Sequence, residues 1–197
     1  MHNTITNLIY IEELIKSKVN HDKLPKIIAV SKTFPIENIL PLIEHGHIHY
    51  GENKVQEALN KWTEIKNQNN MIKLHLIGKL QTNKVKLALK VFDYIHSLDS
   101  EKLATKISEE QAKQGKKPKV FIQVNIGNEE QKSGIPKKKF LAWREPIATR
   151  LLHCQPFMLC GVPKTDMEAT LELAPLLERV IPGKKCSRSP YFVVCTI

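Results

Sequence analysis

The chain has 197 residues, of which 42% are hydrophobic, and its formal net charge is +10. This length suits one domain with a substantial core. No stretch reaches the apolar length that spans a bilayer, and the first residues open an amphipathic pattern without the hydrophobic segment of a signal peptide. We therefore expect a cytoplasmic protein. The positive charge favours an anionic partner, such as nucleic acid, a membrane surface or a phosphorylated small molecule, without choosing among them.

Strands and helices alternate along the first two-thirds of the chain. Helices are indicated by apolar residues at helical spacing, and strands by short apolar runs between turn residues. In chain order, the pattern predicts a helix at 4–18, a strand at 26–31, a helix at 35–46, a strand at 48–50, a helix through Val55 and Trp62, a strand at 73–77, a helix at 82–91, a strand at 94–97, a helix at 100–114 and a strand at 120–125.

This alternation predicts an α/β fold with a parallel sheet. No strand is followed by a GxGxxG or GxxxxGK[ST] element, which counts against dinucleotide-binding and P-loop sheets. We therefore expect a TIM-type (β/α) barrel, with its active site at the carboxyl ends of the strands. The polar groups expected at that end are Lys32, Gly51 to Asn53, Gly78 to Asn83, Ser97 with Asp99, and Asn125.

Lys32 is the most informative of these residues, because it directly follows a buried strand. A lysine that is partly desolvated and close to other cations can lose its proton at neutral pH and attack an aldehyde, forming a Schiff base. That is how pyridoxal phosphate attaches to proteins. A lysine at a strand end is more often a solvated side chain, so the function depends on the motifs around it.

Five ordered segments resemble the pyridoxal phosphate homeostasis proteins, also called the YggS or PROSC family. They cover residues 1 to about 135 and lie at 29–33, 50–57, 75–84, 123–126 and 130–135. The resemblance implies a single-domain barrel like the N-terminal domain of alanine racemase. It also implies that pyridoxal 5'-phosphate is bound covalently at Lys32, that Asn53 lies beside the cofactor ring, and that Lys132 belongs to a loop that helps handle the cofactor.

The function implied by the resemblance is a carrier that holds and passes on the reactive aldehyde without turnover. The alternative is a catalytic pyridoxal phosphate enzyme of the alanine racemase kind. Racemisation also requires a placed acid–base group, such as a tyrosine on a second domain, and the sequence shows no second domain. We expect the small-molecule cofactor as the partner, with no nucleic acid and no membrane. The oligomeric state is left open, and a monomer is favoured.

The C-terminal third departs from the family. Every Asn lies within residues 1–132, whereas all four Arg and all four Cys lie beyond Ser133. The family's Gly- and Ser-rich loops are missing there, as a shifted reading frame or a foreign fusion would explain. We therefore divide the chain into barrel units at 1–135 and a divergent tail at 136–197. The segments 157–162 and 191–197 can each form a strand, but we expect the tail not to complete the barrel.

Other clusters are weaker candidates. His45, His47 and His49 alternate, as in some metal sites, but Gly46 interrupts them and no carboxylate or Cys with ligand spacing lies nearby. The cysteines form no CxxC pair, so neither a zinc site nor a disulfide is expected. The basic runs at 113–119 and 137–139 lack interleaved aromatic residues and are interpreted as solvated faces rather than as a nucleic-acid platform.

Overall fold

The computed structural model describes residues 2–18, 25–125, 133–136, 139, 159–160 and 192–196. In these residues, eight parallel strands form a sheet in the order β6-β5-β4-β3-β2-β1-β8, and β7 also pairs with β5. The strands are β1 (Lys26–Val30), β2 (His49–Glu52), β3 (Lys73–Leu76), β4 (Tyr94–Leu98), β5 (Lys119–Asn125), β6 (Ile135–Pro136), β7 (Leu159–Cys160) and β8 (Phe192–Thr196). The helices are α1 (Asn3–Lys18), η2 (Ile36–Asn38), α2 (Leu40–Glu44), α3 (Val55–Gln68), η3 (Thr82–Lys84), α4 (Val85–Val91) and α5 (Glu101–Gln114).

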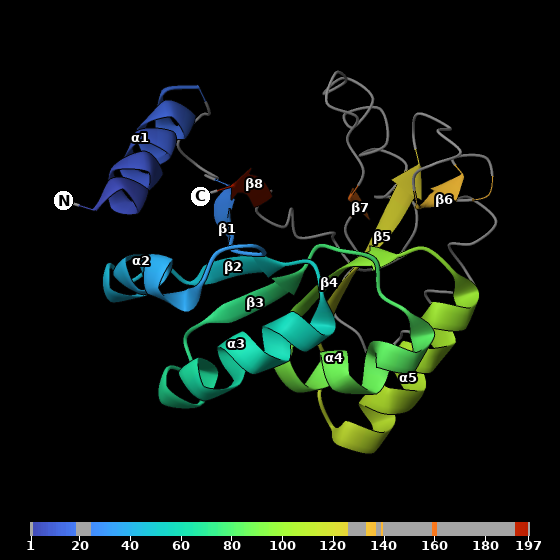
Figure 1. The fold of residues 1–197 in the computed structure, drawn as a ribbon. Coiled ribbons are helices and arrows are strands. Elements are labelled where there is room, and N and C mark those ends of the chain that lie inside the picture. The colour runs from blue at the N-terminus through green and yellow to red at the C-terminus, as the bar shows by residue number, and fades with distance from the viewer. Residues whose placement is uncertain are drawn as a thin grey trace.

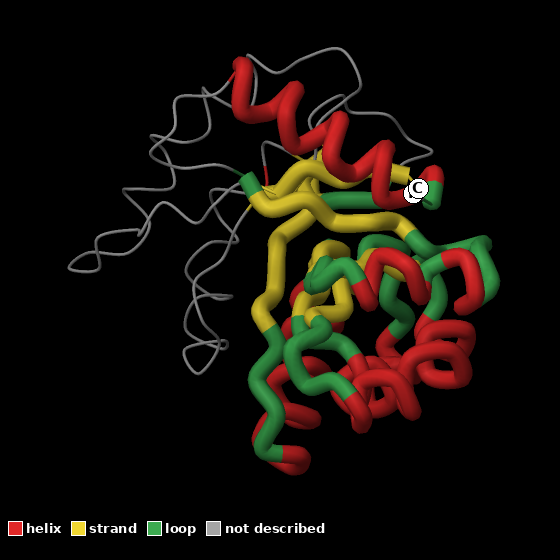
Figure 2. Tube along the Cα trace, turned by 90° about the vertical axis from the view of Figure 1, so that its left-hand side faces the viewer, coloured by secondary structure: helices red, strands yellow, loops and turns green. Residues whose placement is uncertain are grey.

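The helices cover the outer face of the curved sheet. Helices α3, α4 and α5 lie side by side along it, and α1 stands apart from this layer (Figures 1 and 2). Side chains alternate between the two faces of a strand. Those that face the helices join one buried cluster, in which Tyr50, Leu74 and Ile95 from the strands lie with Trp62 and Leu89 from the helices. Burying this apolar surface is the main force that holds the helices on the sheet.

The opposite, inner face also carries large side chains. A Cβ atom placed on Gly51 would lie 3.0 Å from Ile28 Cγ2 and 3.3 Å from Ile77 Cδ1. Further around the same face, the ring of His75 stacks on Tyr94 with centroids 4.1 Å apart. Large side chains therefore fill the interior, as in a packed barrel core rather than a pore.

The predicted alternation of strands and helices is confirmed from α1 to β5, with most boundaries within two or three residues. One difference lies in α3, which continues to Gln68 although 66–70 is a polar stretch. Lys66 can remain helical there because its ammonium donates to the Val91 carbonyl at 2.7 Å and pairs with Asp93. The predicted helix at 35–46 is divided into η2 and α2, and Pro41 lies in the first turn of α2.

Two strands of the divergent tail pair with the sheet. β8 runs parallel to β1 over five residue pairs, from Lys26 with Phe192 to Val30 with Thr196, and β7 pairs with β5. Both strands lie inside the segments that the sequence marked as possible strands. Within the described residues, no pairing joins β8 to β6 or β7. The division at residues 135 and 136 stays a prediction, because most of the tail lies outside the described residues.

Helix α5 has a cap at each end, and the first cap can be tested. The hydroxyl of Ser100 accepts a hydrogen bond from the Leu103 amide at 3.3 Å, and Gly115 ends the helix in the left-handed conformation at φ 68°. We expect Ser100→Ala to lower the free energy of unfolding by about 1 kcal/mol in a urea titration. The exposed Lys102→Ala is the control on the same helix. Equal stability of the two variants would contradict the capping role.

Candidate functional site

Lys32 and Asn53 lie at the same end of neighbouring strands. β1 pairs with β2 so that Val30 lies opposite Gly51, and each predicted site residue follows two positions later. Both side chains are half-buried. The structure therefore brings the two sequence-predicted residues to one place, at the carboxyl ends of β1 and β2. Lys132 lies outside the described residues.

The turn after β3 packs directly against Asn53. A Cβ atom on Gly78 would lie 2.2 Å from the Asn53 carbonyl oxygen and 2.8 Å from its Cα. Only a residue without a side chain allows the two backbones to approach this closely. The segments 50–57 and 75–84, which carry the resemblance, therefore meet at this contact.

Glu52 does not face the same way as Asn53, although the sequence placed the whole segment from Gly51 to Asn53 at the active-site end. It is fully buried, and its Oε1 accepts hydrogen bonds at 2.9 Å from Trp62 Nε1 and from Lys61 Nζ, both on α3. The reason for the difference is the alternation of side chains along a strand, which turns Glu52 towards the helices. Sequence reasoning missed Lys61; the signal available was its position directly before Trp62, which is predicted to be buried.

The other expected polar groups are distributed over the strand ends. Ser97 is buried on β4, Asp99 is half-buried beyond it, and Asn125 is half-buried at the end of β5. Close to Asn125, Gln123 Nε2 donates to the Ser133 carbonyl at 3.0 Å. This contact ties β5 to the segment that contains β6.

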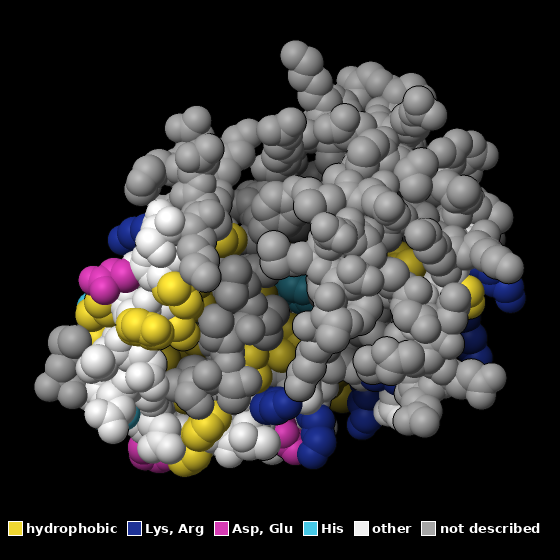
Figure 3. Space-filling view, turned by 90° about the horizontal axis from the view of Figure 1, so that it is seen from above, with side chains coloured by type: hydrophobic (Ala, Val, Ile, Leu, Met, Phe, Trp, Pro, Cys, Tyr) yellow, Lys and Arg dark blue, Asp and Glu magenta, His cyan; other side chains and the backbone are white. Residues whose placement is uncertain are grey.

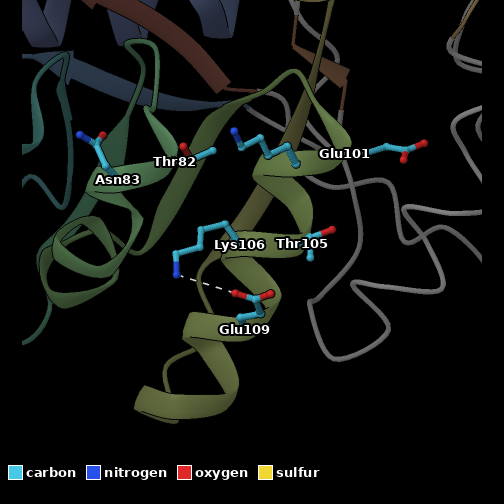
Figure 4. A pocket seen from close by; sticks show the side chains of 7 residues that line it. Thr82, Asn83, Glu101, Thr105, Lys106 and Glu109 are labelled. Atoms are coloured by element: carbon cyan, nitrogen blue, oxygen red, sulfur yellow. Dashed lines mark ion pairs between the residues drawn. The ribbon is translucent and has the colours of Figure 1, made fainter.

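Thr82 and Asn83 line a different hollow, of about 570 Å³, between η3 and α5 (Figure 4). Glu101, Thr105, Lys106 and Glu109 also line it, and Lys106 forms an ion pair with Glu109 at 3.7 Å. Neither Lys32 nor Asn53 is among its lining residues. This end of the segment 75–84 therefore faces a separate hollow, whereas Gly78 contacts the candidate site.

The alternating histidines do not share a face. His45 is exposed at the end of α2, and His47 is half-buried, with its Nε2 2.9 Å from the carbonyl oxygen of His49. His49 is buried on β2. The reason is that the backbone turns at Gly46 and becomes extended only at β2. Across the described ranges, no group of three His, Cys, Asp or Glu side chains is arranged to hold a metal ion.

The structure instead joins His49 to two histidines that sequence reasoning did not single out. His49 Nδ1 lies 2.9 Å from His75 Nε2, and His75 Nδ1 lies 2.9 Å from His96 Nε2, so the three form a buried histidine ladder across β2, β3 and β4. Burial lowers the pKa of His49 and of His96 to about 4. Burial, together with the neighbouring His96 and His49, holds the pKa of His75 well below its usual range. These imidazoles are therefore neutral at pH 7.

The lysine residues of the basic run at 113–119 are exposed. Lys116 donates to the Lys90 carbonyl at 2.8 Å, and the Lys119 ammonium lies 5.5 Å from the centre of the Tyr94 ring. Lysine side chains gather along the margins of the face seen in Figure 3. No helix in the part of the chain that the structure describes combines the length and the apolar character needed to cross a bilayer.

Comparison with known families supports the motifs. The family of alanine racemase N-terminal domains matches residues 12–162. The pyridoxal phosphate homeostasis protein of Pasteurella multocida is 36% identical over 172 residues, covering 85% of this chain and 74% of its own. The protein of the same name from Escherichia coli K12 is 36% identical over 171 residues, covering 84% and 71%.

Solved structures show the same fold. PipY from Synechococcus elongatus, without pyridoxal phosphate, superposes with a TM-score of 0.72 at 27% identity, covering 88% of this chain and 81% of its own. The same protein with pyridoxal phosphate bound gives a TM-score of 0.67 at 27% identity, covering 85% and 80%. An alanine racemase from Clostridium difficile, at 17% identity with a TM-score of 0.56, covers 79% of this chain and 39% of its own, and supports the barrel fold alone.

Proposed function

This chain belongs to the pyridoxal phosphate homeostasis family, and we propose that it carries pyridoxal 5'-phosphate as a Schiff base on Lys32 without turning over a substrate. The observation that carries the proposal is the position of Lys32, a half-buried residue after β1, at the same end of the sheet as the contact between Asn53 and Gly78. The absence of a side chain at Gly78 lets its backbone approach that of Asn53 closely. The bound cofactor supplies an aldehyde that is reactive towards amines.

The residues at the strand ends fit this role. Lys32 reacts as a neutral amine: its nitrogen forms a double bond to the aldehyde carbon, and the aldehyde oxygen leaves as water with the two amine hydrogens. Asn53 offers an amide that can donate and accept hydrogen bonds beside the ring. The loops that hold a phosphate in barrels of this type follow the last strands, and here they lie outside the described residues.

The tyrosines in the described part of the barrel lie away from Lys32 and Asn53. Among the described residues, Tyr10 is exposed on α1 and Tyr94 begins β4 at the opposite end of the sheet. Tyr50 donates to the His47 carbonyl at 3.1 Å, and burial raises the pKa of its hydroxyl. In the described part of the chain, no tyrosine therefore stands at the carboxyl ends of the strands as a second acid–base group.

The proposal is tested by labelling. Purified full-length protein is mixed with pyridoxal phosphate, reduced with borohydride and digested, and the modified peptide is identified by mass spectrometry. We expect the label on Lys32 and its loss in Lys32→Gln, whereas Lys54→Gln, which removes an exposed lysine beyond β2, keeps it. A label on other lysines with Lys32 unmodified would contradict the site. Racemisation of an amino acid that Lys32→Gln abolishes would favour the enzyme.

A further inference from the structure

Every polar atom of Ser31, the residue before Lys32, is held in place. Its amide donates to the Gly51 carbonyl at 2.9 Å, as a continuation of the pairing between β1 and β2. Its hydroxyl donates to Glu52 Oε1 at 2.9 Å. Its carbonyl oxygen accepts from the Phe34 amide at 3.2 Å and from Lys61 Nζ at 2.7 Å. This carbonyl belongs to the peptide bond that leads into Lys32, so fixing it also fixes the plane of that bond.

The hydrogen bond from Lys61 comes from outside the sheet. Lys61 lies on α3, and its ammonium bridges the Ser31 carbonyl and Glu52 Oε1, the latter at 2.9 Å. The side chain of Lys61 is 15% exposed and that of Glu52 is fully buried. A bond made in this dry environment is stronger than one at the surface, and water cannot readily replace it.

The ion pair between Lys61 and Glu52 carries a large desolvation penalty, so it is a poor source of stability. Removing two charges from water costs several kcal/mol per ion in general, and a buried pair often stabilises a fold no more than apolar residues would. Within the described residues, Glu52 Oε2 has no hydrogen-bond partner, which adds to this cost. Glu52 Oε1 also accepts from Trp62 Nε1, and the ammonium of Lys61 is the group of the pair that reaches the peptide bond before Lys32.

We propose that Lys61 and Glu52 are positioning residues for Lys32. Lys61 fixes the Ser31 carbonyl from the helix side, and Glu52 holds Lys61 and the Ser31 hydroxyl. Together they set the direction in which the Lys32 side chain leaves the backbone at the end of β1. This inference rests on the proposed role of Lys32, and it adds that helix α3 controls how well the amine is presented to the cofactor.

Helix α3 provides a matched control. Lys66 lies five positions further along it, is 19% exposed, and also donates to a backbone carbonyl, that of Val91, while pairing with a carboxylate, that of Asp93. Its carbonyl target lies at the end of α4, away from β1. Lys61→Met and Lys66→Met each remove a lysine that bridges a carboxylate and a backbone carbonyl, and only the first contacts the peptide bond before Lys32. Glu52 is fully buried whereas Asp93 is 31% exposed, so the larger loss of stability is expected for Lys61→Met.

The test measures binding of pyridoxal phosphate to the full chain by its visible absorbance, with the unfolding midpoint of each variant measured in urea. We expect both variants to lose stability. Only Lys61→Met should weaken Schiff-base formation at Lys32, by about tenfold, and reduce the visible circular dichroism per bound cofactor. If Lys61→Met does not fold, Ser31→Ala removes the hydroxyl contact alone, and about a threefold loss of binding is expected.

Two results would overturn the inference. One is wild-type binding and circular dichroism in Lys61→Met, or in Ser31→Ala where that variant is used. The other is an equal loss of binding in Lys66→Met, which would assign the effect to general stability. Failure of the proposed function is distinguishable, because the wild-type protein would then carry no label at Lys32. If the wild-type protein is labelled at Lys32 and the variants bind pyridoxal phosphate as the wild type does, only the positioning role is contradicted.

Discussion

Lowering the pH from about 7 to about 5 is expected to remove several kcal/mol from the free energy of unfolding, because the buried histidine ladder resists protonation. His49 and His96 have pKa values of about 4 in the folded state, against 6.5 for an ordinary histidine. Burial is the main cause for both, and for His49 the charges of Lys26 and His47 lower the pKa further. The pKa of His75 is lowered as well.

The sign of the change in stability with pH follows from proton binding. Above about pH 6.5, these histidines are neutral in both the folded and the unfolded state, so they add no pH dependence. Between about pH 6.5 and about pH 4, the unfolded chain binds protons that the folded protein excludes, and stability falls as the pH falls. Each histidine contributes a slope of up to about 1.4 kcal/mol per pH unit. Below about pH 4, the contributions of His49 and His96 level off.

Urea unfolding between about pH 7.5 and about pH 5 measures this effect. Replacing His96 with Gln should reduce the slope by up to about 1.4 kcal/mol per pH unit. Nuclear magnetic resonance of the imidazole protons provides a check that requires no substitution. Titration of the His49 and His96 resonances near pH 6.5 in the folded protein would contradict the lowered pKa values of these two histidines.

Gly78→Ala is expected to destabilise the protein and to disturb the candidate site. The new methyl carbon would lie 2.2 Å from the Asn53 carbonyl oxygen, and the atom that must move belongs to the backbone rather than to a flexible side chain. Overpacking of this kind costs about 1 to 3 kcal/mol. Because the displaced backbone carries Asn53, we also expect cofactor binding at Lys32 to weaken by about tenfold or more.

Gly115→Ala is the control for this prediction. Gly115 has a left-handed backbone at φ 68°, so an alanine there costs about 1 kcal/mol, and no atom lies within 4 Å of the added carbon. It lies at the end of α5, outside the contact between Asn53 and Gly78. Equal binding of pyridoxal phosphate by Gly78→Ala and Gly115→Ala, at matched folded fractions, would show that the close approach at Gly78 does not shape the site.

Several features could be predicted from the sequence because their signals are local. The apolar run at 27–30 is typical of a strand that is buried on both faces. The spacing of apolar residues in α3 to α5 is typical of helices that are buried on one face, because buried positions repeat with the period of the secondary structure. Parallel strands place their carboxyl ends together, so the position of Lys32 followed once the alternation was recognised. The segment from Gly51 to Asn53 was expected at the same end for the same reason, whereas the role of Asn53 beside the cofactor ring was implied by the family resemblance.

Other features depend on contacts between residues that are distant in sequence, and only the tertiary structure decided them. The histidine ladder joins positions 49, 75 and 96, which no local sequence pattern relates. It exists because β2 pairs with β3 and β3 pairs with β4, which brings the three side chains together. Pairing also decided that β8 lies beside β1. The orientation of Glu52 towards Lys61 required both the strand alternation and the placement of α3. The amino-acid sequence by itself determined which elements form and where Lys32 stands, because these depend on neighbours along the chain; the surroundings of Lys32 were decided by packing between elements.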